Sequence, residues 1–144
     1  MSVKKLHAGQ SLFEVVFAVG MVSLVLITLV SLATTSIRNA SNSKTTDLAT
    51  RAAQDATEWI RGQRDSSWTT FSSKAPGVYC LQTLNSWPTQ GNCTNQYIAG
   101  TTILRSVTLT VIDTTTIQAD VKSSWSDGQG AHQIVSSTYF TKWR

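Results

Sequence analysis

The chain has 144 residues, of which only 14% are charged, and its formal net charge is +4 with the histidines neutral. This length leaves room for one folded domain beyond a membrane helix. The mild positive charge does not indicate a nucleic-acid partner, because such partners are usually met by a strong, clustered excess of Lys and Arg.

An apolar segment near the N-terminus is the first predicted element. The 23 residues from Val15 to Ile37 carry no charge, and as a helix they would extend about 35 Å, enough to cross a hydrocarbon core of about 30 Å. Lys4 and Lys5 precede this segment, so the positive-inside rule predicts a cytoplasmic N-terminus and an outward-facing C-terminal domain. We therefore expect a single-pass protein of the cytoplasmic (inner) membrane.

Two residues distinguish this segment from an ordinary membrane anchor. Glu14 lies at the start of the apolar run, where an unpaired carboxylate at helix depth costs about 2.5–3.5 kcal/mol. Gly9 lies five residues earlier. A secretory signal peptide would instead carry a small-residue cleavage site after the apolar run, where only weak candidates follow Ala33 and Ala40.

The N-terminal sequence resembles the class III signal peptide of type IV prepilins. The resemblance is carried by the Lys pair, by Gly9, by the segment Gln10-Ser11-Leu12-Phe13-Glu14 and by the long apolar run that follows. Together these features cover only about 25 residues, but their order and spacing are specific.

The resemblance implies how the chain is processed and assembled. Residues 1–9 would be a leader that a prepilin peptidase removes, and Gln10 would become the N-methylated first residue. The helix over residues 10–36 would be kept, first in the membrane and then in the core of a filament, with Glu14 acting in assembly. The implied partners are the prepilin peptidase, an assembly ATPase, an inner-membrane platform protein and other pilin subunits. The implied final location is the pilus or cell surface.

Two departures from the family pattern favour a minor or divergent subunit over an abundant major one. The first mature residue of this family is usually Phe, and here it is Gln10. Many major pilins also carry a proline further along this helix, and the sequence has none there.

The helix is expected to continue beyond the membrane over residues 37–66, because no Gly or Pro interrupts this stretch until its last turns. The continuation is amphipathic, and one of its faces carries charged pairs three or four residues apart, namely Asp47/Arg51 and Glu58/Arg61. We interpret the charged face as solvated rather than as a basic docking strip. The opposite face carries the apolar residues Leu48, Ala49, Ala52, Ala53, Ala56, Trp59 and Ile60.

Gly62 and the Asp65-Ser66-Ser67 segment predict the end of this helix. The surrounding sequence, from Glu58-Trp59-Ile60-Arg61 to Arg64-Asp65-Ser66-Ser67-Trp68, also resembles the helix exit of minor pilins known as pilus modification proteins. This second resemblance falls where the first requires a helix to end.

Residues 67–144 are expected to form an extracytoplasmic β domain. Alternating apolar and polar residues predict strands, and Asp113-Thr114 and Asp127-Gly128-Gln129-Gly130 predict turns between them. The phase of the last strand is ambiguous, which suggests either two partly covered faces or a bulge. The fold class is α+β, with the helix packed on a small antiparallel sheet of three to four strands. The expected strands are 78–84, 104–111, 117–125 and 134–143.

Residue patterns typical of catalysis are missing from the sequence. Cys80 and Cys93, with no clustered His, do not predict a zinc site. In an outward-facing domain they predict a disulfide closing the loop 80–93, worth about 3 kcal/mol. His132 is expected to be a solvent-exposed strand residue. Asp113, Asp120 and Asp127 recur every seven residues, and we interpret them as turn and strand-surface residues. We expect neither an enzyme nor a cofactor.

Five tryptophans are many for a chain of this length. The simplest interpretation is that a thin sheet-on-helix core needs large side chains, and we place Trp59 and Trp125 there. Trp87, beside Pro88 in the Cys80–Cys93 loop, is the best candidate for an exposed aromatic residue that contacts glycans or a partner.

The sequence leads to four functional interpretations. The leading one is a structural subunit, most consistent with a minor pilin, of a type IV pilus or related filament. A pseudopilin of a type II secretion or DNA-uptake system would carry the same signal. An uncleaved bitopic membrane protein with a binding domain would make the Gly9/Glu14 spacing accidental. A membrane-tethered enzyme would need the catalytic clusters that the sequence lacks.

Overall fold

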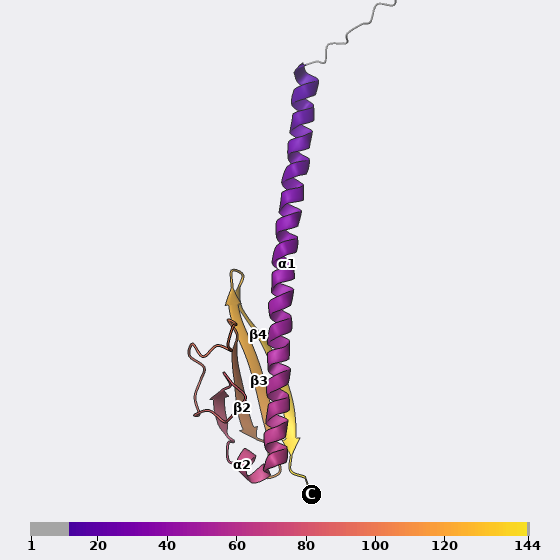
Figure 1. The fold of residues 1–144 in the computed structure, drawn as a ribbon. Helices are drawn as coiled ribbons and strands as arrows, with labels where there is room; N and C mark the ends of the chain where they lie inside the picture. The colour runs from indigo at the N-terminus through magenta and orange to yellow at the C-terminus, as the bar shows by residue number, and fades with distance from the viewer. Residues whose placement is uncertain (1–11, 144) are drawn as a thin grey trace, which may run out of the picture. The chain divides into compact units, whose positions relative to one another are not determined.

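The computed structural model describes residues 12–143, which fall into two compact units divided between Ser43 and Lys44. The first helix, α1 (Leu12–Ser66), begins in the first unit and ends in the second (Figure 1). It ends at Ser66, as the Gly62 and Asp65-Ser66-Ser67 signals predict.

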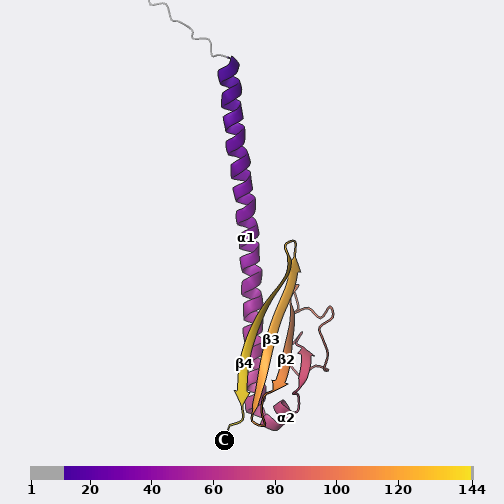
Figure 2. The same cartoon turned by 180° about the vertical axis from the view of Figure 1, so that it is seen from behind.

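The second unit confirms the predicted α+β class, because the C-terminal part of α1 packs on a four-stranded antiparallel sheet. Consecutive strands are neighbours in the order β1-β2-β3-β4, which Figure 2 shows with the sheet in front of the helix. A short helix follows α1 directly. These elements are α2 (Trp68–Ser72), β1 (Gly77–Cys80), β2 (Leu104–Val111), β3 (Thr116–Asp127) and β4 (Gly130–Thr141).

The register of β3 and β4 resolves the ambiguous phase of the last strand. The two strands pair without interruption from Thr116↔Thr141 to Asp127↔Gly130, so β4 contains no bulge along this ladder. Phe140 is buried on the inner face, whereas Val135 on the outer face is 52% exposed. The β3–β4 turn is the predicted hairpin, and Gly130 there has a φ of 128°, a conformation that suits glycine.

The alanines of α1 let the helix approach the sheet closely. Ala49, Ala53 and Ala56 are buried, as is Ile60 one turn further on. Leu48 was predicted on this face but is 42% exposed, because it lies at the margin of the contact. The rest of the core is supplied by apolar side chains of α2, of the sheet and of the residue that follows β1, including Phe71, Leu81, Val107, Leu109, Ile117, Val121 and Phe140.

The connection between helix and sheet was not predicted in detail. Ser67 caps α2, accepting a hydrogen bond of 3.2 Å from the backbone N–H of Thr70. The first strand is β1, shorter than the predicted 78–84 and starting one residue earlier. Its first residue is a glycine for a steric reason, since a Cβ at Gly77 would lie 2.7 Å from the carbonyl oxygen of Lys74.

Candidate functional site

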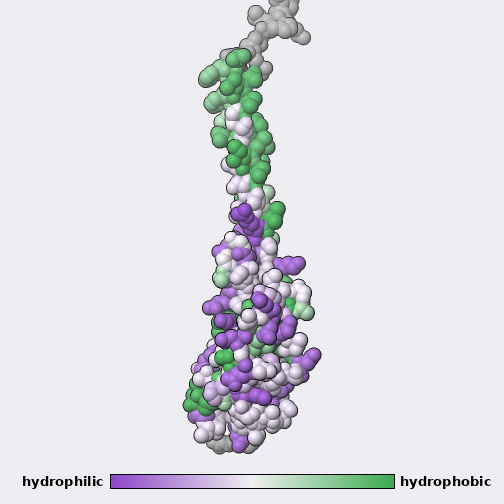
Figure 3. All heavy atoms as spheres, turned by 90° about the vertical axis from the view of Figure 1, so that its left-hand side faces the viewer, coloured by the Kyte–Doolittle hydropathy of each residue, from purple (hydrophilic) through white to green (hydrophobic). Residues whose placement is uncertain are grey.

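The apolar part of α1 is exposed along its whole length within the first unit. Its most apolar 18-residue window has a mean hydropathy of 2.7 and none of it is buried. By length and composition α1 is able to cross a membrane, and apolar side chains gather over its N-terminal part in Figure 3. An exposed apolar surface of this extent marks a site of interaction with a membrane or with other proteins.

Four hydroxyl groups in this part of α1 bond back to the helix. Ser23 donates to the carbonyl oxygen of Val19 at 2.8 Å, and Thr34 donates to that of Val30 at 2.9 Å. Thr28 and Thr35 bond back to preceding carbonyls in the same way. These residues therefore add no unpaired polar group to an apolar environment.

Glu14 lies in the first turn of α1 and is exposed. Within residues 12–143 it takes part in no ion pair. The next basic residue along the helix is Arg38, about 36 Å further on at the helical rise per residue. Gly9 and Gln10, the predicted cleavage and methylation site, lie outside the described residues.

Cys80 and Cys93 are joined by a disulfide, which confirms the predicted pair. The loop that it closes lies against the outer edge of β1. There the backbone N–H of Gly91 donates to the carbonyl oxygen of Val78 at 2.8 Å, and Tyr79 forms an isolated bridge with Gln90.

Trp87, the candidate exposed aromatic residue, is half-buried and packs against the core. Its indole N–H donates to the side-chain oxygen of Gln63 on α1 at 3.1 Å. Its ring lies 4.9 Å from that of Trp59 and 5.1 Å from that of Tyr79, measured between ring centroids. The disulfide ties the loop to β1, and this aromatic cluster folds the rest of the loop onto the core.

A different tryptophan is exposed. The side chain of Trp143 is 70% exposed, but it is held in place by its contacts with α1. The guanidinium of Arg64 lies 4.8 Å from its ring centroid, and its indole N–H donates to Asp65 at 3.3 Å. Hydrogen bonds from Arg64 and Trp143 lower the pKa of Asp65.

His132 differs from the predicted solvent-exposed strand residue. Its ring stacks on that of Trp125, with centroids 5.4 Å apart and an interplanar angle of 19°. Its Nε2 lies 3.0 Å from a carboxylate oxygen of Asp127. His132 is therefore half-buried and forms part of the hairpin structure.

The three regularly spaced aspartates have the structural roles that we predicted. Asp113 accepts a 2.7 Å hydrogen bond from the backbone N–H of Thr115 in the β2–β3 turn, and this bond lowers its pKa. In the β3–β4 hairpin, the pKa of Asp127 is lowered by the backbone N–H of Gln129 and by His132. Asp120 accepts from the Gln118 side chain on the sheet surface.

Arg105 is a buried cation that the sequence reasoning missed. It is 4% exposed, and its guanidinium donates to the carbonyl oxygens of Leu81 at 3.0 Å and Ala52 at 2.9 Å. Burial lowers its pKa, and the nearby Asp55 carboxylate acts in the opposite direction. The alternation of residues along β2 indicates this burial, because Arg105 lies two residues before the buried Val107 and therefore faces the same side of the sheet.

Among residues 12–143, no group of three or more His, Cys, Asp and Glu side chains is placed to hold a metal ion. No family model, no curated protein and no solved structure matches the chain.

Proposed function

We propose that this chain is a minor subunit of a type IV pilus or a related filament, cleaved by a prepilin peptidase and assembled through its N-terminal helix. The observation that carries the proposal is the order Gly9, Glu14 and an uninterrupted apolar helix, preceded by Lys4 and Lys5. A helix joined to a small disulfide-bonded α+β unit is compatible with such a subunit.

The apolar part of α1 supports assembly because it lies open over residues 12–37. Lipid would cover it before assembly, and apolar helices of neighbouring subunits would cover it in a filament. Transfer between these two environments costs little hydrophobic free energy, since both are apolar. Specific polar contacts must then set the position of one subunit relative to the next.

Glu14 is suited to provide such a contact. Cleavage after Gly9 would create an amine at Gln10, and the amine of one subunit would pair with Glu14 of its neighbour. The amine of the same subunit is only four residues away at the helix start and is poorly placed to bond well. Breaking a buried ion pair by removing one partner costs about 3–5 kcal/mol, which is enough to control incorporation.

The proposed partners follow from this role. The prepilin peptidase would act on residues 1–9 at the cytoplasmic face of the membrane, and an assembly ATPase with an inner-membrane platform protein would drive extraction. Other pilin subunits would be the permanent contacts. A pseudopilin of a secretion or DNA-uptake system would share all of these steps, and an uncleaved bitopic binding protein would share none.

The proposal is tested by asking whether the chain is part of an extracellular filament. Filaments sheared from cells are purified and their subunits are identified by mass, with the membrane fraction as the reference. We expect the chain in the sheared fraction at low abundance relative to a major subunit. Its complete retention in the membrane fraction of cells that display filaments would contradict the filament role.

A further inference from the structure

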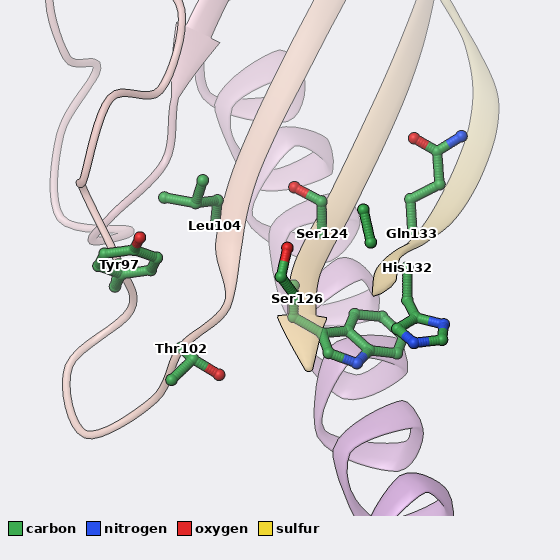
Figure 4. A pocket seen from close by; sticks show the side chains of 9 residues that line it. Tyr97, Thr102, Leu104, Ser124, Ser126, His132 and Gln133 are labelled. Atoms are coloured by element: carbon green, nitrogen blue, oxygen red, sulfur yellow. The ribbon is translucent and has the colours of Figure 1, made fainter. Parts of the chain in front are cut away.

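A depression of about 650 Å³ lies on the sheet face that points away from α1, beside the β3–β4 hairpin (Figure 4). Strands β2, β3 and β4 form its floor, and the segment 97–102 forms one side. Trp125 and His132 also contribute to the lining, at the hairpin end of β3 and β4. The lining also includes Tyr97, Thr102, Leu104, Ser124, Ser126 and Gln133.

The side formed by residues 97–102 is a defined turn. The backbone N–H of Ile98 donates to the carbonyl oxygen of Ile103 at 2.9 Å, and that of Thr101 donates to Ile98 at 3.0 Å. Tyr97 forms an isolated bridge with Leu104, the first residue of β2. These bonds place the Tyr97 ring, 42% exposed, at the rim of the depression.

The hairpin end of the depression is also fixed. Trp125 is buried and packs with Ala49 of α1, so its ring lies on the α1 side of the sheet. His132 stacks on that ring, and Asp127 holds the imidazole at 3.0 Å. Asp127 also accepts a hydrogen bond of 2.7 Å from the backbone N–H of Gln129. Its carboxylate is therefore engaged in the hairpin and does not line the depression.

The lining carries hydrogen-bonding groups but no Lys, Arg, Asp or Glu. Among the described residues, the side chains of Thr102, Ser124, Ser126 and Gln133 make no hydrogen bond to the protein, and neither does the Tyr97 hydroxyl. Hydroxyl and amide groups both donate and accept. An anionic ligand would find neither Lys nor Arg here, and His132, which contributes to the lining, is engaged by Asp127 at 3.0 Å. Nucleic-acid phosphates are mostly neutralised by Lys and Arg.

We propose that this depression binds a neutral carbohydrate. The C–H groups on one face of a sugar ring would pack on the Tyr97 ring and Leu104. Its hydroxyls would exchange hydrogen bonds with Ser124, Ser126 and Gln133. A few polar groups placed around an aromatic and apolar surface are the usual composition of a small-ligand site. A protein partner is less well suited, because such interfaces depend on buried apolar anchors and this floor is mostly Ser and Gln.

The proposal goes beyond the filament role and does not depend on it. The test uses the full chain in detergent micelles and an array of immobilised neutral oligosaccharides of hexoses and N-acetylhexosamines, with sialylated and sulfated oligosaccharides alongside. The variants are Tyr97→Ala and Gln133→Leu. Tyr139→Ala is the matched control, since it removes an exposed tyrosine from the same sheet face outside the depression.

We expect the protein to retain a subset of the neutral oligosaccharides, and the free sugar to compete for binding. Tyr97→Ala and Gln133→Leu should each weaken binding about tenfold or more, while Tyr139→Ala should leave it unchanged. The intact disulfide and an unchanged thermal midpoint establish that a variant is folded. If Tyr97→Ala fails this check, Gln133→Leu carries the test, because Gln133 is exposed and makes no side-chain bond to the rest of the described chain.

Three results would overturn the proposal. These are retention of no neutral oligosaccharide, retention of the anionic ones alone, and binding that is equally strong in the folded Tyr97→Ala and Gln133→Leu variants.

Discussion

The guanidinium of Arg105 donates a 2.9 Å hydrogen bond to the carbonyl oxygen of Ala52, a residue 53 positions earlier in the chain. A second bond joins it to the carbonyl oxygen of Leu81, which follows β1. One buried cation thus connects α1, the start of the disulfide loop and β2. Its partners are carbonyl dipoles, so the contact depends on helix and strand being correctly placed.

Replacing Arg105 should therefore destabilise the second unit. Arg105→Ala removes two hydrogen bonds from a charged donor and leaves a cavity, and we expect a loss of about 2–4 kcal/mol in the free energy of unfolding. Arg105→Met keeps most of the volume and should lose less, because an apolar side chain avoids burying a charge. Urea unfolding of the full chain in micelles measures both. An unchanged midpoint for Arg105→Ala would contradict this role.

The two tryptophans outside the regular elements should respond differently to truncation. Trp87→Ala removes a half-buried ring that packs on Trp59 and Tyr79, and we expect a loss of about 2–3 kcal/mol. Trp143→Ala removes a ring that is 70% exposed, and we expect a loss below about 1 kcal/mol. Thermal unfolding of the two variants compares them directly. Equal losses would mean that Trp87 contributes less to the core than its contacts indicate.

The turn aspartates predict how stability depends on pH. Hydrogen bonds lower the pKa values of Asp113 and Asp127 below their ordinary value of 3.8. Such groups bind fewer protons in the folded state, so their contribution is complete above that value and is lost as the pH falls through the lowered folded values. The thermal midpoint should stay level down to about pH 5 and fall below about pH 4.

Asp127→Asn should flatten this acid-dependent loss, because the amide keeps a hydrogen-bond acceptor for Gln129 but cannot titrate. Asp47→Asn, at an exposed helix position, controls for the change in net charge. A variant with the same acid dependence as the wild type would show that Asp127 does not contribute to it.

Much of the second unit could be predicted from the sequence because its patterns are local. The alternation of apolar and polar residues predicted β2 and β3, and the Asp127–Gly130 segment predicted the hairpin between β3 and β4. The alanines of α1 indicated its buried face. The disulfide followed from having only two cysteines in a domain predicted to face outward.

The features that were missed depend on long-range contacts. The exposure of Trp87 could not be judged, because its burial requires the disulfide loop to return to Gln63, 24 residues earlier. The depression beside the hairpin brings Tyr97 close to residues of β3 and β4 that lie about 30 positions later in the chain. No local sequence pattern predicts that proximity. The buried position of Arg105 was visible in the alternation, but a charged residue in a strand is usually expected to face solvent.

Glu14→Ala should separate assembly from folding. Glu14 lies far from the second unit in the sequence, so we expect the variant to be cleaved, inserted and disulfide-bonded but poorly incorporated into filaments. Glu14→Gln should behave in the same way, because it also removes the charge that would pair with an amine. Ser23→Ala is the control, since its hydroxyl bonds only within the helix. The measurement compares sheared-filament and membrane fractions, and equal incorporation of all variants would contradict the pairing of Glu14.

The most direct test of the filament account is the intact mass of the protein purified from membranes. Cleavage after Gly9 with retention of the apolar helix predicts a mature chain of residues 10–144, with one added methyl group on Gln10. This result depends on the signal alone and requires no assembled filament. A full-length chain beginning at Met1 would support an uncleaved bitopic protein, and a chain beginning after Ala33 would indicate an ordinary secretory signal. Either of these masses would contradict the account.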